Sequence, residues 1–289
     1  MSDPRPIGVF DSGVGGLTVL REIIRRTPLE PTVYLGDNDR APYGTRPDDE
    51  VLAFSTQSLD ALVERGVKAL VVACNTSTAV GLLAFRRRYD VPVLGVVRPG
   101  AAAAALATRN RRVGVIATPA TIRSHAYLDA IKVENPSVDV VEHATPALVP
   151  MVESGVLSGE AAEATVAASL APLIGDAADA AARAASRDGR PPSDSIDTLL
   201  LGCTHYPLLR SVFVGLLGDD VAIVDSATAT ASALAELLSA NRLEAPTGTA
   251  PSHIQLTTGD PDRFAAVAGR LFGTTFVSVE PVELGALAL

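Results

Sequence analysis

The sequence predicts an α/β protein built from two similar halves, each a mostly parallel β-sheet flanked by helices. Short apolar runs alternate with stretches of helical spacing along most of the 289 residues. The first of these runs, IGVF at 7–10, has a counterpart of the same pattern in VGVI at 113–116. The two cysteines of the chain each follow an apolar run at matching places in the two halves. Because strand–helix–strand units are right-handed and place successive strands in parallel, this alternation favours parallel sheets.

Composition limits the class of protein before any motif is considered. Hydrophobic residues make up 47% of the chain, as in a globular protein with a sizeable core. The net charge of −9 argues against a nucleic-acid-binding surface but is compatible with a small anionic substrate held by backbone N–H groups. We see no signal-peptide pattern and no apolar run of the roughly 20 residues that a membrane span needs. We therefore expect a soluble cytoplasmic protein without a membrane or nucleic-acid partner, whose two cysteines are free thiols.

The first half opens with a strand at 7–10, a Gly-rich turn at 11–16 and a helix at 17–26. The turn matches neither G-x-G-x-x-G nor the phosphate-loop pattern with its lysine, so its glycines are expected to allow a tight turn. Asp11 and Ser12 lie where the strand ends, which is the usual ligand position in an open α/β sheet. The other elements expected here are a strand at 32–37, a loop at 38–47, a helix at 48–63 capped by Asp48, a strand leading to Cys74, a helix at 78–89 capped within 75–77, and a strand at 93–97 closed by Pro99 and Gly100.

The loop at 38–47 contains candidate donors for a carboxylate. Its Pro and Gly residues mark it as a loop, and it carries Arg40, Tyr43 and Gly44. On composition alone an ordinary solvated loop explains these residues equally well.

The second half restarts the scheme after an Ala-rich helix at 101–107. An insertion at about 176–195 is rich in Ala, Pro and Gly, and its part at 186–195 is expected to be exposed and mobile. We expect one domain from 1–97 with 225–289 and a second from 98–224. The elements expected in the second domain are a strand at 113–118, a helix from 119 through 131, a strand at 138–142, a loop opened by 151–155, an Ala-rich helix to about 185, a strand leading to Cys203 and a strand at 221–225. The tail is expected to form a helix at 227–238, a strand at 253–258, a helix to 271 and a strand at 276–279. Asp260 is the expected N-cap of the helix that ends at 271, with Pro261 in its first turn.

Two cysteines in matching strand-end positions indicate thiol chemistry. If the halves are related by a pseudo-twofold, each presents a thiol at the carboxyl edge of its sheet, with the active site between them. A thiol and a thiolate on opposite sides of a carbon can remove a proton from one face and return another to the other face. The helix after each cysteine is expected to favour the thiolate through its free N–H groups. Asp11 and His205 are candidates to tune or relay protons for Cys74 and Cys203 respectively.

Other interpretations of these residues stay open at this point. A cysteine in an apolar strand is usually a small buried hydrophobic residue, and His205 beside Cys203 is equally well explained as a helix-start residue. A Cys–His hydrolase or a thiol redox protein leaves the second cysteine unexplained, and there is no C-x-x-C motif. Metal binding is disfavoured because His125, His143 and His253 lack paired spacing, and no lysine at a strand end suits pyridoxal phosphate. A two-domain solute-binding protein with structural cysteines is a rival of another class.

Four motifs together resemble those of the glutamate racemases, in the cofactor-independent aspartate/glutamate racemase superfamily. They are GVFDSGVGGLTV at 8–19, DRAPYG at 39–44, VACNT at 72–76 and LGCTHYPLL at 201–209. The resemblance runs from residue 7 to about 280, with the motifs in the family's order. Smaller similarities are PGA at 99–101, VESG at 152–155 and TTGDP at 257–261.

This resemblance implies an enzyme that interconverts L- and D-glutamate without metal or pyridoxal phosphate and supplies D-glutamate for peptidoglycan. Cys74 and Cys203 would be the two acid–base thiols, with Cys74 taking the α-proton of D-glutamate, and Asp11 and His205 would assist them. Members are commonly homodimers, and a racemase of aspartate or a hydantoin is the alternative within the superfamily. The positions that match substrate contacts or line the site are Asp11, Ser12, Tyr43, Gly44, Asn75, Thr76, Thr118, Thr121, Glu153, Thr204 and His205.

Overall fold

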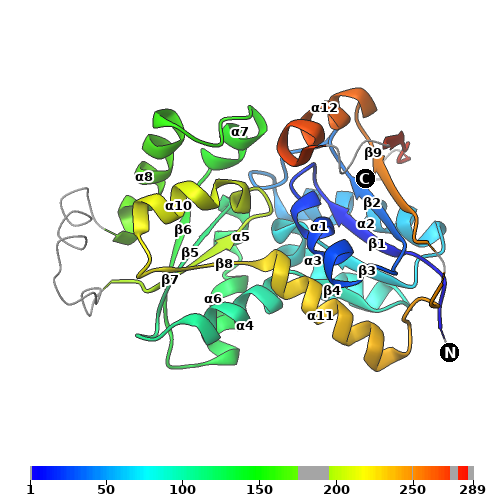
Figure 1. Ribbon diagram of the computed structural model, residues 1–289, viewed down its shortest axis with the longest axis horizontal. Coiled ribbons are helices and arrows are strands. Elements are labelled where there is room, and N and C mark those ends of the chain that lie inside the picture. The colour runs from blue at the N-terminus through cyan, green and yellow to red at the C-terminus, as the bar shows by residue number, and fades with distance from the viewer. Residues whose placement is uncertain (1, 175–194, 249, 274–278, 286–289) are drawn as a thin grey trace. The chain divides into compact units, whose positions relative to one another are not determined.

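The computed structural model describes residues 2–174, 195–248, 250–273 and 279–285 (Figure 1). Its contacts divide the chain into two compact units, one formed by Met1–Val96 with Ala227–Leu289 and the other by Val97–Ser226. These boundaries lie within two residues of the domain boundaries expected from the sequence. That each unit is a domain able to fold by itself stays a prediction.

The described strands of the first unit form one parallel sheet in the order β10-β9-β2-β1-β3-β4. Every residue of β1, β2 and β3 is buried, as is typical of a parallel sheet covered by helices on both faces. The tail strand β9 pairs with β2 in a register that places Thr257 opposite Gly36. The strands are β1 (Ile7–Asp11), β2 (Thr32–Gly36), β3 (Ala69–Val72), β4 (Val93–Gly95), β9 (His253–Thr257) and β10 (Val279–Pro281).

Helices cover both faces of this first sheet. Helices α2 and α3 pack against each other, and α2 contacts β1 while α3 contacts β3 and β4. Helix α1 meets α12 through Arg21, whose guanidinium carbon lies 5.6 Å from the ring centre of Phe272. Because right-handed crossovers that run in opposite directions along a sheet use opposite faces, α1 lies on the face away from α2 and α3. The helices are α1 (Leu17–Arg26), α2 (Asp48–Glu64), α3 (Asn75–Arg88), α11 (Ser226–Asn241) and α12 (Pro261–Phe272).

The second unit has a smaller parallel sheet, whose described strands run in the order β6-β5-β7-β8. Helices α4 and α6 pack together on one face, and α8 and α10 pack together on the other (Figure 1). The strands are β5 (Arg112–Ala117), β6 (Asp139–Ala144), β7 (Thr198–Gly202) and β8 (Ala222–Asp225). The helices are α4 (Val97–Ala107), α5 (Pro119–Arg123), α6 (Ala126–Glu134), α7 (Leu148–Glu153), α8 (Glu160–Ile174), the 3-10 turn η1 (Tyr206–Leu209) and α10 (Arg210–Leu217).

The two sheets repeat one topology. The order β2-β1-β3-β4 in the first unit matches β6-β5-β7-β8 in the second, so the first strand of each repeat is flanked by the second and the third. Cys74 follows the third strand of the first repeat and Cys203 the third strand of the second. The expected fold class of two similar α/β halves with parallel sheets is therefore confirmed.

Three helices include residues that the sequence placed outside a helix. Helix α4 starts at Val97 and includes Pro99, which was expected to close a strand. Proline is tolerated there because the first N–H groups of a helix have no partner within it. Helix α3 starts at Asn75, so this residue belongs to the first turn and does not cap it. The loop expected at 151–155 is largely helix, since α7 runs through Glu153.

The helix expected from 119 through 131 is interrupted. Helix α5 ends at Arg123 and α6 begins at Ala126, with His125 between them in the left-handed region at φ 54°. This conformation has a steric cost for any residue other than glycine. The apolar spacing of the sequence continues across His125, so it did not reveal the break. In contrast, Asp260 caps α12 as expected, with its carboxylate accepting from the N–H groups of Asp262 and Arg263.

Some expectations fall outside the described residues. These are the end of the Ala-rich helix beyond residue 174, the insertion up to residue 194, and the part of the last strand before Val279. Ser195, which was counted with the exposed insertion, is buried, and its carbonyl accepts a hydrogen bond of 2.9 Å from the side chain of Asn110. Among the described helices, none combines the length and apolar character of a membrane span.

Candidate active site

The carboxyl ends of β1 and β3 bring Asp11, Ser12 and Cys74 together, because these two strands are neighbours in the first sheet. Asp11 is the last residue of β1 and is fully buried, and its carboxylate accepts from the N–H of Gly13 at 3.0 Å. The hydroxyl of Tyr34 on β2 donates to the carbonyl of Gly13 at 2.6 Å. Strand and turn together therefore fix the position of the Asp11 carboxylate.

Gly16 in the same turn is needed for a close approach. A Cβ atom on Gly16 would lie 2.4 Å from the Cβ of Asp11 and 2.8 Å from the hydroxyl oxygen of Tyr34. The φ of Gly16 is −62°, which any residue adopts. A tight turn was the expected reason for these glycines, whereas at Gly16 the reason is the space taken by Asp11.

Cys74 caps the helix that follows it. Its sulfur accepts from the N–H of Ser77 at 3.4 Å and donates to the hydroxyl oxygen of Ser12 at 3.7 Å. Burial and then the charge of Asp11 raise the pKa of Cys74 from its ordinary 9.0 to about 11, although its hydrogen bonds with Ser77 and Ser12 lower it. The N–H of Ser77 at the helix start does lower the pKa of Cys74, but desolvation and the neighbouring anion outweigh it, so the net shift is upward.

The loop after β2 is organised by Asp37, which is fully buried. Its Oδ2 accepts from the Tyr43 hydroxyl and, at 2.7 Å, from Nε of Arg40, and its Oδ1 accepts from the Thr258 hydroxyl at 2.7 Å. Burial, followed by the charge of Asp37, raises the pKa of Tyr43, so that this residue stays a neutral donor. Tyr43 and Gly44 were expected from the sequence, but Asp37 was not, although its place directly after a strand was an available signal.

Tyr43 also belongs to the surroundings of Cys74. Both lie in one buried hydrophobic cluster with Phe10 and Phe54, and the rings of Tyr43 and Phe10 are 6.3 Å apart. Asn75, Thr76 and Gly44 are buried as well. The first unit thus gathers one group of expected site residues, namely Asp11, Ser12, Tyr43, Gly44, Cys74, Asn75 and Thr76.

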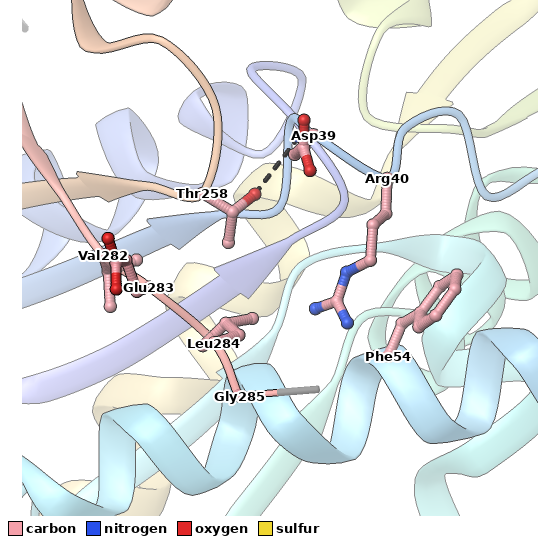
Figure 2. A pocket seen from close by; sticks show the side chains of 8 residues that line it. All are labelled: Asp39, Arg40, Phe54, Thr258, Val282, Glu283, Leu284 and Gly285. Carbon is pink, nitrogen blue, oxygen red and sulfur yellow. Dashed lines mark hydrogen bonds between the residues drawn. The ribbon is translucent and has the colours of Figure 1, made fainter. Parts of the chain in front are cut away.

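A cavity of about 450 Å³ lies beside the loop that follows β2, residues 37–47, which we call the Asp37 loop (Figure 2). The Arg40 guanidinium reaches into it, with Nη1 donating to Gln57 at 2.6 Å and its carbon 4.4 Å from the ring centre of Phe54. Of the candidate donors named from the sequence, Arg40 lines this cavity, whereas the two cysteines and the positions that match substrate contacts do not. Its lining consists of Asp39, Arg40, Phe54, Thr258, Val282, Glu283, Leu284 and Gly285.

The second unit gathers the other expected residues at the ends of β5 and β7, which are neighbours in its sheet. The sulfur of Cys203 lies 3.8 Å from Nδ1 of His205, and Nε2 of His205 lies 3.2 Å from a carboxylate oxygen of Glu153. Burial lowers the pKa of His205, but the hydrogen bonds and charges of Cys203 and Glu153 outweigh it and raise this pKa to about 10. Cys203 therefore lies beside a cation, whereas Cys74 lies beside an anion.

Threonine hydroxyls complete the second group. Thr118 follows β5 and caps α5, where its oxygen accepts from the N–H of Thr121 at 3.4 Å and lies 3.0 Å from the Thr121 hydroxyl. Thr118, Thr121 and Thr204 are all buried. The hydroxyl of Tyr206, just after His205, pairs with the Thr145 hydroxyl at 2.7 Å and fixes the turn that carries Cys203.

Each unit therefore presents a buried thiol, an ionisable neighbour and several hydroxyl or backbone donors at the carboxyl edge of a parallel sheet. Such a set can exchange a proton with a small acidic molecule and bind its carboxylates. In the part of the chain that the structure describes, no group of three or more His, Cys, Asp or Glu side chains is arranged to hold a metal ion.

Comparison with known proteins agrees with this arrangement. Residues 7–234 match the family described as Asp/Glu/Hydantoin racemase. A glutamate racemase of Geobacter metallireducens is 44% identical over 98% of both chains, and one of Listeria monocytogenes is 42% identical over 96% of this chain and 98% of its own. The crystal structure of glutamate racemase isoform RacE1 from Bacillus anthracis superposes with a TM-score of 0.85 at 40% identity, covering 97% of this chain and 98% of that one. That of the Francisella tularensis glutamate racemase in complex with D-glutamate gives 0.85 at 32% identity and 98% coverage of both. The chain belongs to the Asp/Glu/hydantoin racemase family.

Proposed function

We propose that this protein is a glutamate racemase, which interconverts L- and D-glutamate by transfer of the α-proton between two thiols, without a cofactor. The observation that carries the proposal is the repeated placement of one buried cysteine after the third strand of each sheet, in a chain 44% identical to a glutamate racemase over 98% of its length. The product D-glutamate would serve peptidoglycan synthesis, as the family's role implies. Racemisation of aspartate or a hydantoin is not favoured, since the curated relatives named above are glutamate racemases.

The different surroundings of the two thiols support opposite starting roles. Cys74, with its pKa raised to about 11, holds its proton at neutral pH and is ready to act as an acid. The sulfur of Cys203 lies 3.8 Å from Nδ1 of His205, whose own pKa is raised to about 10. In the direction from L- to D-glutamate, Cys203 takes the α-proton and Cys74 delivers a proton to the other face of the carbon. In the reverse direction Cys74 is the base and Cys203 the acid.

The remaining site residues are proposed to bind the substrate and to stabilise its charge. The α-hydrogen of an amino acid is very weakly acidic, so donors near the α-carboxylate must stabilise the negative charge that develops when the proton leaves. Asp11 tunes Cys74 and His205 tunes Cys203, while Glu153 orients His205. The residues proposed as substrate contacts are Asp11, Ser12, Tyr43, Gly44, Asn75, Thr76, Thr118, Thr121, Glu153, Thr204 and His205.

Solvent exchange tests the activity directly. Each enantiomer of glutamate is incubated with the enzyme in heavy water, and α-deuterium is followed by NMR while optical rotation is followed by circular dichroism. We expect both enantiomers to lose rotation and gain deuterium, and we expect Cys74→Ala and Cys203→Ala to abolish net racemisation. Absence of exchange with both enantiomers would reject the proposal. Exchange with aspartate in place of glutamate would change the substrate.

We further propose that the enzyme is a cytoplasmic homodimer. Leu106 and Val133 in the second unit are 88% and 76% exposed, which leaves apolar surface for a partner to cover. Light scattering coupled to size exclusion should give twice the chain mass, and the protein should appear in the cytosolic fraction. A single-chain mass at micromolar concentration would refute the dimer without affecting the proposed activity.

A further inference from the structure

The turn that follows β9 contacts the loop that carries Tyr43, although 221 residues separate Asp37 from Thr258. The pairing of β9 with β2 places Thr257 opposite Gly36, so the next residue, Thr258, lies beside Asp37. The N–H of Thr258 extends this pairing by donating to the carbonyl of Gly36 at 3.2 Å. The register between β9 and β2 therefore places the Thr258 side chain next to the Asp37 carboxylate.

The Thr258 hydroxyl joins two parts of the loop. It donates to Oδ1 of Asp37 at 2.7 Å. It also accepts from the N–H of Asp39 at 3.1 Å, the contact drawn as a dashed line in Figure 2. One hydroxyl thus fixes the carboxylate at the start of the loop and the backbone two residues later. Valine has nearly the same shape as threonine but can make neither bond.

Asp37 carries this constraint to Tyr43. The carboxylate is fully buried, and its second oxygen accepts from the Tyr43 hydroxyl and from Nε of Arg40. Removal of the Thr258 hydroxyl takes a donor from a buried anion, which is costly, so the carboxylate is expected to turn toward another donor. Its bond to Tyr43 would change with it.

We infer that Thr258 is a positioning residue for glutamate binding, which acts by orienting Asp37 and, through it, Tyr43 and Gly44. This inference rests on the proposed function, in which Tyr43 and Gly44 contact the substrate. Thr258 has no hydrogen bond to either thiol, and its effect reaches the site only through the Asp37 loop. The substitution Thr258→Val should therefore raise KM and leave kcat nearly unchanged.

The test compares three variants. Thr258→Val should lower kcat/KM for glutamate about 10- to 100-fold, the range for loss of a hydrogen bond to a charged group, mainly through KM. Thr258→Ser, which keeps the hydroxyl, should stay within about threefold of the unmodified enzyme. Thr257→Val is the matched control, since its hydroxyl, at 3.1 Å from Oδ1 of Asn38, lies on the same turn but does not contact Asp37. It should lose stability without a rise in KM.

A double-mutant cycle tests the route through Asp37. In a Tyr43→Phe background the Thr258→Val effect should shrink to about threefold or less, because the tyrosine hydroxyl that Asp37 holds is already gone. Additive effects, an unchanged KM in Thr258→Val, or equal damage from Thr258→Ser would overturn the inference. If Thr258→Val does not fold, Thr258→Ala carries the same expectation. Failure of the unmodified enzyme to racemise glutamate would instead reject the proposed function.

Discussion

The titration of Cys74 offers the sharpest test of how the fold tunes a thiol. The perturbation is Asp11→Asn in a Cys203→Ser background, so that Cys74 is the single thiol left. Asparagine keeps an oxygen that accepts from the Gly13 N–H but removes the charge that helps to raise the pKa of Cys74. The pKa of Cys74 should therefore fall below about 11 in the Asp11→Asn protein.

The size of the effect follows from the pKa. A rise from 9.0 to about 11 is two units, or about 2.7 kcal/mol of preference for the protonated form. At pH 8 this rise in pKa reduces the fraction of Cys74 present as thiolate from about 10% to about 0.1%, roughly 100-fold. In the Cys203→Ser protein the logarithm of the alkylation rate with iodoacetamide should therefore rise with unit slope to pH 10 without levelling.

The assay relies on the shape of the rate profile, because a buried thiol also reacts slowly for reasons of access. Restricted access of iodoacetamide to Cys74 lowers the alkylation rate at every pH but does not move the midpoint of the rate profile. When urea unfolds the protein, this midpoint should return to the ordinary thiol pKa of about 9. A native profile that levels at pH 9 or below would refute the reasoning. An Asp11→Asn profile displaced to higher pH would also refute it, since it would show that the charge of Asp11 does not help to raise the pKa of Cys74.

Three further perturbations test other parts of the site and its framework. Gly16→Ala places a Cβ 2.4 Å from that of Asp11, so it should lower the free energy of unfolding by about 1–3 kcal/mol in urea titration and lower racemase activity. Glu153→Gln removes one of the charges that raise the pKa of His205, so the ring should titrate below the present value of about 10 when followed by NMR. Asp197 accepts four hydrogen bonds in the second unit, and those from Thr108 and two backbone N–H groups help to lower its pKa below 3.8. Its stabilisation should be full above pH 3.8 and lost as the pH falls through the lowered pKa, so Asp197→Asn should cost about 1–3 kcal/mol at pH 7 and less at pH 3.

The sequence predicted those parts of the fold that local patterns determine. The strands that end at Asp11 and before Cys74 were apolar runs followed by small polar residues, and the structure has both. The start of α12 was predicted from Asp260 and Pro261, because capping depends on residues within one turn. The two thiols were recognisable for the same reason, since each sits at a boundary between two local patterns.

What the sequence did not predict depends on contacts between distant segments. The pairing of β9 with β2 brings Thr258 to Asp37, and neither residue carries a local signal for the other. The left-handed His125 breaks a helix whose apolar spacing continues across the break. The pKa of Cys74 is raised by burial and by Asp11, 63 positions away, and these two effects outweigh the helix-start N–H group that the local sequence predicted.

The contrast between the two thiols can be traced to two positions at which the repeats differ. IGVFDS at 7–12 corresponds to VGVIAT at 113–118, so the carboxylate of Asp11 has Ala117 as its counterpart. CNT at 74–76 corresponds to CTH at 203–205, so His205 stands in the place of Thr76. The carboxylate of Asp11 therefore lies beside Cys74 and the ring of His205 beside Cys203, although the two sheets have the same strand order. A racemase that uses two thiols needs one of them protonated and one deprotonated when substrate arrives, and a strictly symmetric pair would favour neither assignment. These two differences make the charged surroundings of the two thiols unequal while the strand order of each half is kept.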